Sequence, residues 1–430
     1  MGTKYQALKG MEDILPGEIE KWQWLEEKAR NFFESRGFKE IRTPILEPTE
    51  LFARSVGEGS DIVHKQMFSF EDRGERNVSL RPEMTVSVAR AIIEHGLLKQ
   101  AKSLRLYYLG PMFRSERPQA GRKRQFHQIG IEIINEANVA GFNVDFDAIF
   151  QLCTFLEYIG LKKENFCLRL NDLGDFSQQQ RLATKLKQYF SQQKSKLCSD
   201  CQYRLDKNVL RIFDCKNESC QPVIDKAPWN EIAPLSKAFE EGLIPALRDG
   251  SIPAEINRRL VRGLDYYNGI VFEVVAAGIG AQDAIAGGGR YDHLYSDLGG
   301  DPTPCTGFSI GMERLLSVLE NTKPSLSDRI QLRRVYLAPL EDSAKVRVHV
   351  HEKALYLRER DIRVETLLGE TSLSKHLKKA NQLGIRFVLI LGSKEVENGC
   401  WAVKDMEKES SQVDIPDQQL GSYLEQALGS

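Results

Sequence analysis

The stretch MFRSERPQAGRKRQFHQIGIE, residues 112–132, carries more charge than a pair of strands needs. It overlaps two segments, LRLYYLGPMFR and QFHQIGIEII, whose apolar and aromatic content predicts strands, and the loop between them is too charged for a tight hairpin. Arg114 and Glu116 alternate as if on one strand face, and Phe126 follows the loop. Such a set suits a nucleotide: arginine binds phosphate, a flat ring stacks on the base and glutamate accepts from a base amine. The alternative is a solvated hairpin with surface ion pairs.

Three more segments are unusually polar, namely LRPEMT (80–85), LVRGLDYYNG (260–269) and GFSIGMERL (307–315). In the second, Arg262 always keeps its charge and therefore needs an anion or a carboxylate. Asp265, three residues later, is the structural alternative to a bound anion. Tyr266 and Tyr267 place hydroxyls on rigid apolar rings, which suits a pocket or a core.

The elements around these segments predict a sheet covered by helices. Apolar residues recur at helical spacing in the first forty residues, at Ile19, Trp22, Leu25, Ala29 and Phe32. The next segment, FKEIRTPILEP, reads as a strand interrupted by Pro44, which confines it to a sheet edge or a bulge. Such an edge faces either solvent or a second subunit. Residues from about 166 to 250 differ in composition and are interpreted as a helical insertion between two pieces of one sheet.

The C-terminal part of the chain alternates strands and helices after a polar, proline-containing linker, NTKPSLSD. The order is RVYLAPL, a helix over 343–360, IRVET, a helix through LSKHLKKANQLG, and RFVLIL. This alternation is typical of a small α/β domain with a largely parallel sheet. Lys375, Lys378 and Lys379 make one of its helices basic, which suits either phosphate contacts or a solvated face.

Taken together and in order, the polar segments resemble the motifs of class II aminoacyl-tRNA synthetases. GFKEIRTPILEP resembles motif 1, MFRSERPQAGRKRQFHQ motif 2 and GFSIGMERL motif 3, while LVRGLDYYNG and AGGGRYD resemble the two histidine-specific motifs of histidyl-tRNA synthetases. The resemblance covers nearly the whole chain. It implies an α/β and α+β multidomain protein: an antiparallel-sheet catalytic core in two parts (1–165 and 251–322), a helical insertion (166–250), a linker (323–332) and a C-terminal α/β anticodon-binding domain (333–430).

The resemblance also implies a reaction and the residues that serve it. Histidine would be activated by ATP, with Mg²⁺, to histidyl-adenylate and pyrophosphate, and then transferred to the 3′ end of tRNA-His. By position in the motifs, Arg114 and Arg262 are the catalytic residues at the α-phosphate. Arg314 is expected at the γ-phosphate, Glu116 at the adenine amine and Phe126 on the adenine ring.

Histidine recognition is assigned to residues of three motifs. Selecting an imidazole needs an acceptor for one ring N–H and a hydroxyl for the other nitrogen, and Glu132 and Tyr267 match those positions. The remaining positions around the substrate are Glu83, Met84, Thr85, Gln128, Tyr266 and Tyr291. The family usually has glycine where this chain has Met84, so the methionine either adds bulk beside the pocket or turns into the core.

Four of the eight cysteines cluster in the insertion, at Cys198, Cys201, Cys215 and Cys220. The first pair has the C-x2-C spacing of a zinc half-site, and the C-x4-C spacing of the second is looser. We favour reduced thiols over a structural zinc ion, and we expect no metal at the catalytic site. The sparse cysteines fit a reducing cytoplasm.

Composition limits the alternatives. Charged residues make up 28% of the 430, yet the net charge is −1, so nucleic-acid binding must rely on local basic patches. No apolar run is long enough for a membrane span. The resemblance implies a homodimer, since motif 1 usually lies at a dimer contact. Two other functions remain: the regulatory subunit of ATP phosphoribosyltransferase, which resembles the core but loses catalytic arginines, and a synthetase for proline or threonine, which RGLDYYNG disfavours.

Overall fold

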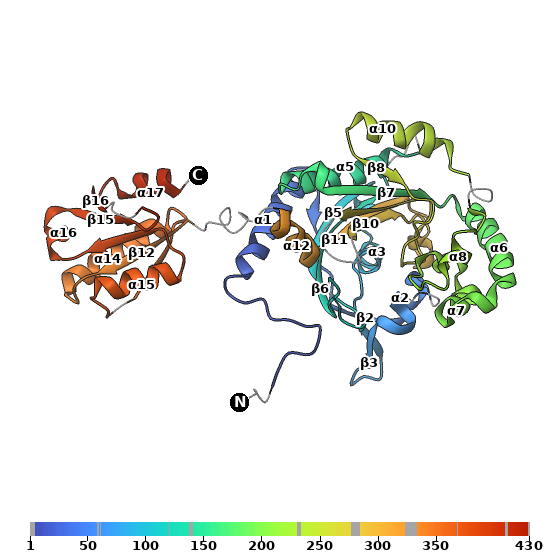
Figure 1. The fold of residues 1–430 in the computed structure, drawn as a ribbon, viewed down its shortest axis with the longest axis horizontal. Coiled ribbons are helices and arrows are strands. Elements are labelled where there is room, and N and C mark those ends of the chain that lie inside the picture. Colours follow the sequence, from blue (N-terminus) through green and yellow to red (C-terminus); the bar gives the residue numbers. More distant parts are fainter. Residues whose placement is uncertain are drawn as a thin grey trace. The chain divides into compact units, whose positions relative to one another are not determined.

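The computed structural model describes residues 5–57, 60, 62–119, 121–136, 141–229, 234–276, 284–322, 333–367, 369–408 and 412–428. The chain divides into two compact units, Met1–Leu326 and Ser327–Ser430, each with its own sheet (Figure 1). The linker expected at 323–332 lies outside the described residues. No helix in the described ranges combines the length and the apolar character that a membrane crossing requires.

The first unit is built on an eight-stranded sheet with the strand order β1-β5-β6-β11-β10-β9-β7-β8. The pairs β1–β5 and β7–β8 are parallel, and the five pairs between them are antiparallel. The strands are β1 (Lys39–Glu40), β5 (Leu104–Phe113), β6 (Gln125–Ile134), β7 (Phe166–Asp172), β8 (Ala254–Ile256), β9 (Ile270–Ala276), β10 (Ala284–Arg290) and β11 (Cys305–Gly311).

The strand expected around Pro44 is divided between two sheets. Before the proline, β1 lies at the edge of the large sheet; after it, β2 (Leu46–Pro48) joins a small sheet with β3 (Phe68–Glu71) and β4 (Asn77–Leu80), in the order β2-β4-β3. Because proline lacks the N–H that a ladder needs, the chain changes sheets there.

One face of the large sheet packs against three helices, α1 (Ile19–Glu34), α5 (Asn143–Tyr158) and α12 (Met312–Thr322). Phe33 of α1 lies against the rings of Tyr107, Phe155 and Phe308, which fixes the helix on the strands. The shorter helices of the core are α2 (Thr49–Val56), α3 (Thr85–Glu94), α4 (Leu97–Gln100) and α11 (Leu294–Asp297).

The insertion starts later than the sequence predicts. Residues 166–172 form β7, a strand of the large sheet, so the helical part begins after Asp172. It contains α6 (Phe176–Gln192), α7 (Ser199–Lys207), α8 (Gln221–Ile224) and α10 (Ile244–Asp249), with a 3-10 turn at Val209–Asp214. Helices α6, α7 and α8 gather near α2, away from α1 and α12 (Figure 1). Their apolar side chains continue the core beneath α3, so the insertion is packed into the catalytic unit.

The second unit has a five-stranded sheet in the order β13-β12-β14-β15-β16. Only β13–β12 and β12–β14 are parallel, so the sheet is mixed rather than largely parallel, because the chain adds an antiparallel hairpin after RFVLIL. The strands are β12 (Arg334–Pro339), β13 (Arg363–Thr366), β14 (Phe387–Leu391), β15 (Cys400–Asp405) and β16 (Gln412–Pro416), and the helices are α14 (Ala344–Arg358), α15 (Leu373–Gln382), α16 (Ser393–Asn398) and α17 (Leu420–Leu428).

Candidate active site

A cavity of about 710 Å³ opens on one face of the large sheet and is also lined by Glu313 and Arg314 from the start of α12. The strand register shows which side chains share that face, since residues two apart on a strand and directly paired residues point the same way. Tyr108 pairs with Gly130, Gly130 with Ser309, Ser309 with Gly287, and Gly287 with Glu273. A row of polar side chains and glycines therefore crosses five strands and forms the floor of the cavity.

Arg262 lies over this floor, held against β10 and β9. An added Cβ on Gly287 would stand 2.1 Å from its Nη2, so a side chain there would displace the guanidinium. Nη1 is 3.7 Å from Glu273, the cross-strand partner of Gly287, and the alternative pairing with Asp265 is not the one that forms. In the described part of the chain, the buried Nε has no hydrogen-bond partner. The guanidinium thus keeps a free donor for an anion in the cavity.

Arg114 reaches the cavity from the loop after β5. The strand ends at Phe113, so Arg114 and Glu116 belong to the loop. The alternation had predicted that they lie on a strand face, and this prediction is wrong. Nε of Arg114 donates to the carbonyl of Pro82 over 3.0 Å, and the guanidinium stands 5.1 Å from the centroid of the Phe126 ring. Burial lowers the pKa of Arg114, although a guanidinium remains charged at neutral pH.

Arg314 and Arg122 add further positive charge to the cavity wall. Arg314, in the first turn of α12, donates from Nε to the carbonyl of Gly121 and from Nη1 to that of Ala284, both over 2.7 Å. Arg122 forms an ion pair of 2.8 Å with Glu116. These contacts hold the loop and the helix together, and all three charged side chains line the cavity.

Glu132 lies on β6 behind the cavity wall. Its Oε1 accepts a hydrogen bond of 2.7 Å from the Thr85 hydroxyl, and Oε2 accepts one from Tyr291. Gly307 makes room for it, because an added Cβ would stand 2.0 Å from Oε2. Thr85 lines the cavity, whereas Glu132 and Tyr291 do not. Glu132 therefore reaches the cavity through Thr85.

Burial raises the pKa of Glu132 from its ordinary 4.5 to about 8, despite the hydrogen bonds from Tyr291 and Thr85. Between these two values the folded state holds a proton that the unfolded state has lost, so this residue's contribution to stability is lost as pH rises from about 4.5 to 8. Glu132→Gln keeps the shape without the titration. We expect the wild type to lose stability relative to this variant between pH 5 and pH 8, measured by urea unfolding at several pH values. A constant difference would contradict the raised pKa.

Glu83 supports the start of α3. Its carboxylate accepts from the backbone N–H of Thr85 over 2.8 Å and of Val86 over 2.9 Å, and from the Tyr266 hydroxyl over 3.2 Å. Burial raises its pKa, opposed by these hydrogen bonds. Tyr266 and Tyr267 line the cavity with ring centroids 4.7 Å apart.

Gln128 completes the wall on β6. Its Nε2 donates to the Ser309 hydroxyl over 3.1 Å. Within the described residues its buried Oε1 has no hydrogen-bond partner. A buried acceptor without a partner costs free energy, so a ligand that donates to it would bind favourably.

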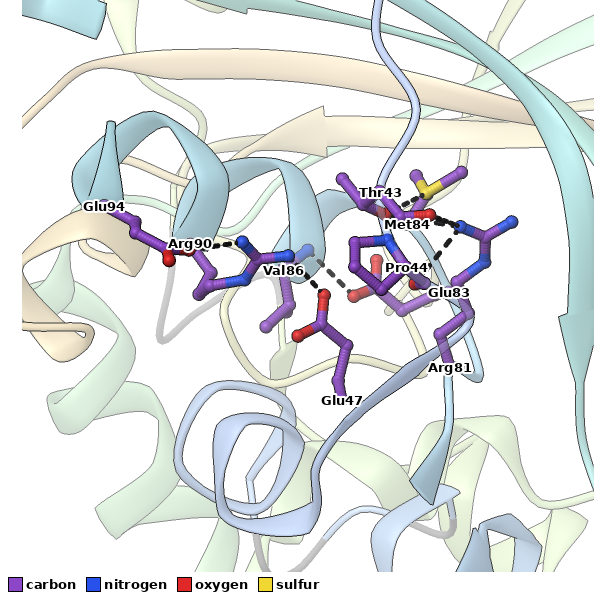
Figure 2. Close-up of polar contacts among 9 residues, drawn as sticks. All are labelled: Thr43, Pro44, Glu47, Arg81, Glu83, Met84, Val86, Arg90 and Glu94. Carbon is purple, nitrogen blue, oxygen red and sulfur yellow. Dashed lines mark hydrogen bonds and ion pairs between the residues drawn. The ribbon is translucent and has the colours of Figure 1, made fainter. Parts of the chain in front are cut away.

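Met84 does not belong to the cavity wall, contrary to its assignment among the substrate-binding residues. Its side chain is 1% exposed and packs in the core under α3. The thioether accepts from the Thr43 hydroxyl over 3.1 Å, on the side where Arg81 donates to the carbonyl of Thr43 over 2.8 Å. Figure 2 shows Met84 beside Thr43 and Arg81, while the Glu83 carboxylate meets Val86. A flexible thioether fills this space without entering the cavity.

Met84→Ala is therefore expected to destabilise the fold by about 2–5 kcal/mol, as usual for a buried methionine, and to leave histidine affinity within two-fold, roughly 0.4 kcal/mol. Met84→Leu, which conserves volume, should cost less than about 1.5 kcal/mol. Urea unfolding and calorimetric titration measure the two quantities. If a stably folded alanine variant bound histidine more weakly, Met84 would have to belong to the histidine pocket.

Sequence reasoning missed several residues that line the cavity. Glu273 was hidden in the apolar segment IVFEVVAA, where a lone glutamate inside a strand was the available signal. Arg169 of β7, 3.6 Å from Glu273, and Arg211 of the insertion lay in a region interpreted as separate from the catalytic sheet. Nη1 of Arg211 donates to the carbonyl of Arg262 over 2.9 Å, a contact between distant segments that spacing alone does not reveal.

Comparison with known proteins points to one family. The family described as Histidyl-tRNA synthetase matches residues 10–204 and 230–315, and the Anticodon binding domain matches 334–427. The Histidine--tRNA ligase of Synechococcus sp. (strain CC9902) is 41% identical over 415 residues, 95% of each chain. That of Thermotoga sp. (strain RQ2) is 40% identical over 424 residues, 98% of each. The apo histidyl-tRNA synthetase of S. aureus has a TM-score of 0.77 at 31% identity, covering 98% of this chain and 99% of that one.

Proposed function

The chain belongs to the histidyl-tRNA synthetase family, and from this premise we propose how its residues carry out the ligation of histidine to tRNA-His. The histidine carboxylate attacks the α-phosphate of ATP, which gives histidyl-adenylate and pyrophosphate. The histidyl group then passes to the 3′-terminal ribose of the tRNA. The observation that carries the proposal is the convergence of Arg114, Arg262 and Arg314 on one cavity with Thr85 and Gln128.

ATP is placed along the row of arginines. Arg114 and Arg262 bind the α-phosphate and stabilise the negative charge that develops as the carboxylate attacks, an effect that is large in a site where water is excluded. Arg314 binds the γ-phosphate. Phe126 stacks on adenine and Glu116 accepts from its amine. ATP enters as its magnesium complex, with the cation belonging to the substrate.

Histidine is placed between α3 and the tyrosines. A Thr85 hydroxyl that donates its one proton to Glu132 faces the cavity as an acceptor, which suits an imidazole N–H. The Tyr267 hydroxyl serves the other ring nitrogen. Oε1 of Gln128 and the carboxylate of Glu83 accept from the α-ammonium group, and Tyr266 closes the pocket. Glu132 and Tyr291 are positioning residues in this scheme.

The alternative functions fit less well. A regulatory subunit that only senses histidine has no need of three arginines in a second, anion-binding part of the cavity, whereas adenylate formation does. The presence of a domain that matches the Anticodon binding domain also favours a ligase. A synthetase for proline would have no use for paired polar groups facing an aromatic ring.

We also propose a cytoplasmic homodimer. Next to Pro44, Ile45 and Leu46 are 42% and 47% exposed, and β1 beside them has one unpaired edge. Exposed apolar groups at a strand edge suit a subunit contact better than solvent. Light scattering should give twice the mass of 48.8 kDa; a monomer at micromolar concentration would contradict the homodimer.

Aminoacylation tests the complete reaction. Purified protein with ATP, magnesium, radiolabelled histidine and a tRNA-His transcript should form acid-precipitable histidyl-tRNA. A transcript that lacks its 3′-terminal adenosine is the matched control, since it removes the accepting ribose. Histidine activation without transfer to the intact transcript would limit the proposal to the first step.

A further inference from the structure

The four clustered cysteines come together in the fold, although sequence reasoning favoured independent thiols. Their Sγ atoms all lie within 4.8 Å of one another, and Cys198 and Cys215 are 3.8 Å apart. Zinc–thiolate bonds of about 2.3 Å in a tetrahedron set the sulfurs about 3.8 Å apart. Among the described residues this quartet is the one group of three or more candidate metal ligands. We propose that it binds a single structural Zn²⁺.

The backbone around the quartet is arranged as thiolates require. The N–H of Cys198 donates to the Sγ of Cys220 over 3.2 Å, and that of Asn217 donates to the Sγ of Cys215 over 3.4 Å. Such donors offset the negative charge of four thiolates around a divalent ion. Three of the cysteines are buried and Cys198 is partly buried. Four thiolates fill a tetrahedral coordination shell and leave no position for a water ligand, which distinguishes a structural zinc from a catalytic one.

A single ion suits the spacing better than an iron–sulfur cluster. A cluster spreads its cysteine ligands over more than one iron atom, and therefore holds them farther apart than this quartet. All eight cysteines of the chain are free, so no disulfide competes within the quartet. Four thiolates in a tetrahedron suit zinc and disfavour hard cations such as Mg²⁺ and Ca²⁺, which prefer oxygen ligands.

The ion would close a loop that supports the candidate active site. Cys198 and Cys201 stand at the start of α7, and Cys215 and Cys220 follow the 3-10 turn Val209–Asp214. Between them, Arg211 donates to the carbonyl of Arg262 over 2.9 Å and Asn208 donates to Asp265 over 2.9 Å. The quartet thus fixes both ends of the segment that contacts the motif containing Arg262. The family match passes over residues 205–229, where half of the quartet lies.

Metal analysis of the untagged full-length protein tests the proposal. After gel filtration in metal-free buffer, inductively coupled plasma mass spectrometry should find about one zinc ion per chain. Cys201→Ser and Cys220→Ser should each lower this below one tenth, while Cys167→Ser and Cys400→Ser, outside the quartet, should retain it. Where a quartet variant fails to fold, a mercurial reagent added to the wild type should release one zinc to a colorimetric chelator.

Cobalt provides a second readout that does not depend on activity. Protein purified after growth with Co²⁺ should show the intense visible and thiolate-to-metal bands of a tetrahedral four-sulfur site. No bound zinc and no cobalt spectrum, a coloured iron protein, or a disulfide among these cysteines in the native protein would each overturn the proposal. Metal content is measured independently of the reaction. Absence of zinc would therefore leave the proposed ligase function unaffected, and absence of ligase activity would leave the zinc proposal unaffected.

Discussion

Replacing Arg262 by alanine is expected to reduce histidine-dependent ATP–pyrophosphate exchange by about 10²–10³-fold, the loss found when one preorganised donor to a developing oxyanion is removed. Histidine affinity, measured by calorimetric titration, should change by less than about three-fold, or roughly 0.7 kcal/mol, because the proposed role of the guanidinium is to bind the α-phosphate. Exchange that survives within a few-fold would show that Arg262 only pairs with Glu273.

Two further variants separate charge from position. Arg259→Ala removes an arginine three residues before Arg262 whose side chain is 49% exposed and paired with Asp225, and the exchange rate of this variant should stay near that of the wild type. Gly287→Ala keeps Arg262 but adds a Cβ where Nη2 now lies. Since the end of an arginine side chain can move, the fold should survive, yet exchange should fall at least ten-fold.

Replacing Glu132 by alanine is expected to raise the KM for histidine about 10- to 100-fold, since it leaves the hydroxyls of Thr85 and Tyr291 without their acceptor and frees the Thr85 proton. The KM for ATP should change less than three-fold, roughly 0.7 kcal/mol, because the hydrogen bonds of Glu132 go to Thr85 and Tyr291 and ATP is assigned to the arginines and Phe126. Steady-state exchange kinetics with each substrate varied separately measure the two effects.

Glu132→Gln is the matched control for this prediction. Its amide oxygen still accepts from Thr85, and at neutral pH the native carboxyl, with a pKa of about 8, is itself largely protonated. We therefore expect the glutamine variant to restore the KM for histidine to within about three-fold of the wild type. An equal increase of the KM for histidine in both variants would mean that the negative charge of Glu132 itself recognises the imidazole. Loss of ATP binding in either would mean that Glu132 serves the fold.

Local signals in the sequence mark most of the elements and most of the residues that line the cavity. Arg262 and Arg314 stand in short polar segments next to apolar strands, and the structure brings both to one cavity with Arg114. The mistaken details arise from three-dimensional packing. Whether Met84 faces the cavity or the core depends on space beside Thr43 and Arg81, and no spacing rule reports that space.

The contacts of the insertion could not be predicted from the sequence either. Its composition marks it as different, yet β7 continues the large sheet and Arg211, within the insertion, contacts Arg262. The C-x2-C and C-x4-C pairs looked like a weak signal along the chain. Their significance depends on distances between sulfurs that only the folded loop provides.

We propose that this cavity activates histidine and no other amino acid. ATP–pyrophosphate exchange measured on the purified protein, with magnesium and with each of the twenty amino acids in turn, tests it directly. Exchange is expected with histidine alone, because the paired polar groups at Thr85 and Tyr267 reject side chains that leave them unsatisfied. Absence of exchange in a protein that still binds histidine would contradict the claim and favour the regulatory paralogue. Exchange with a different amino acid would contradict the assignment of the pocket.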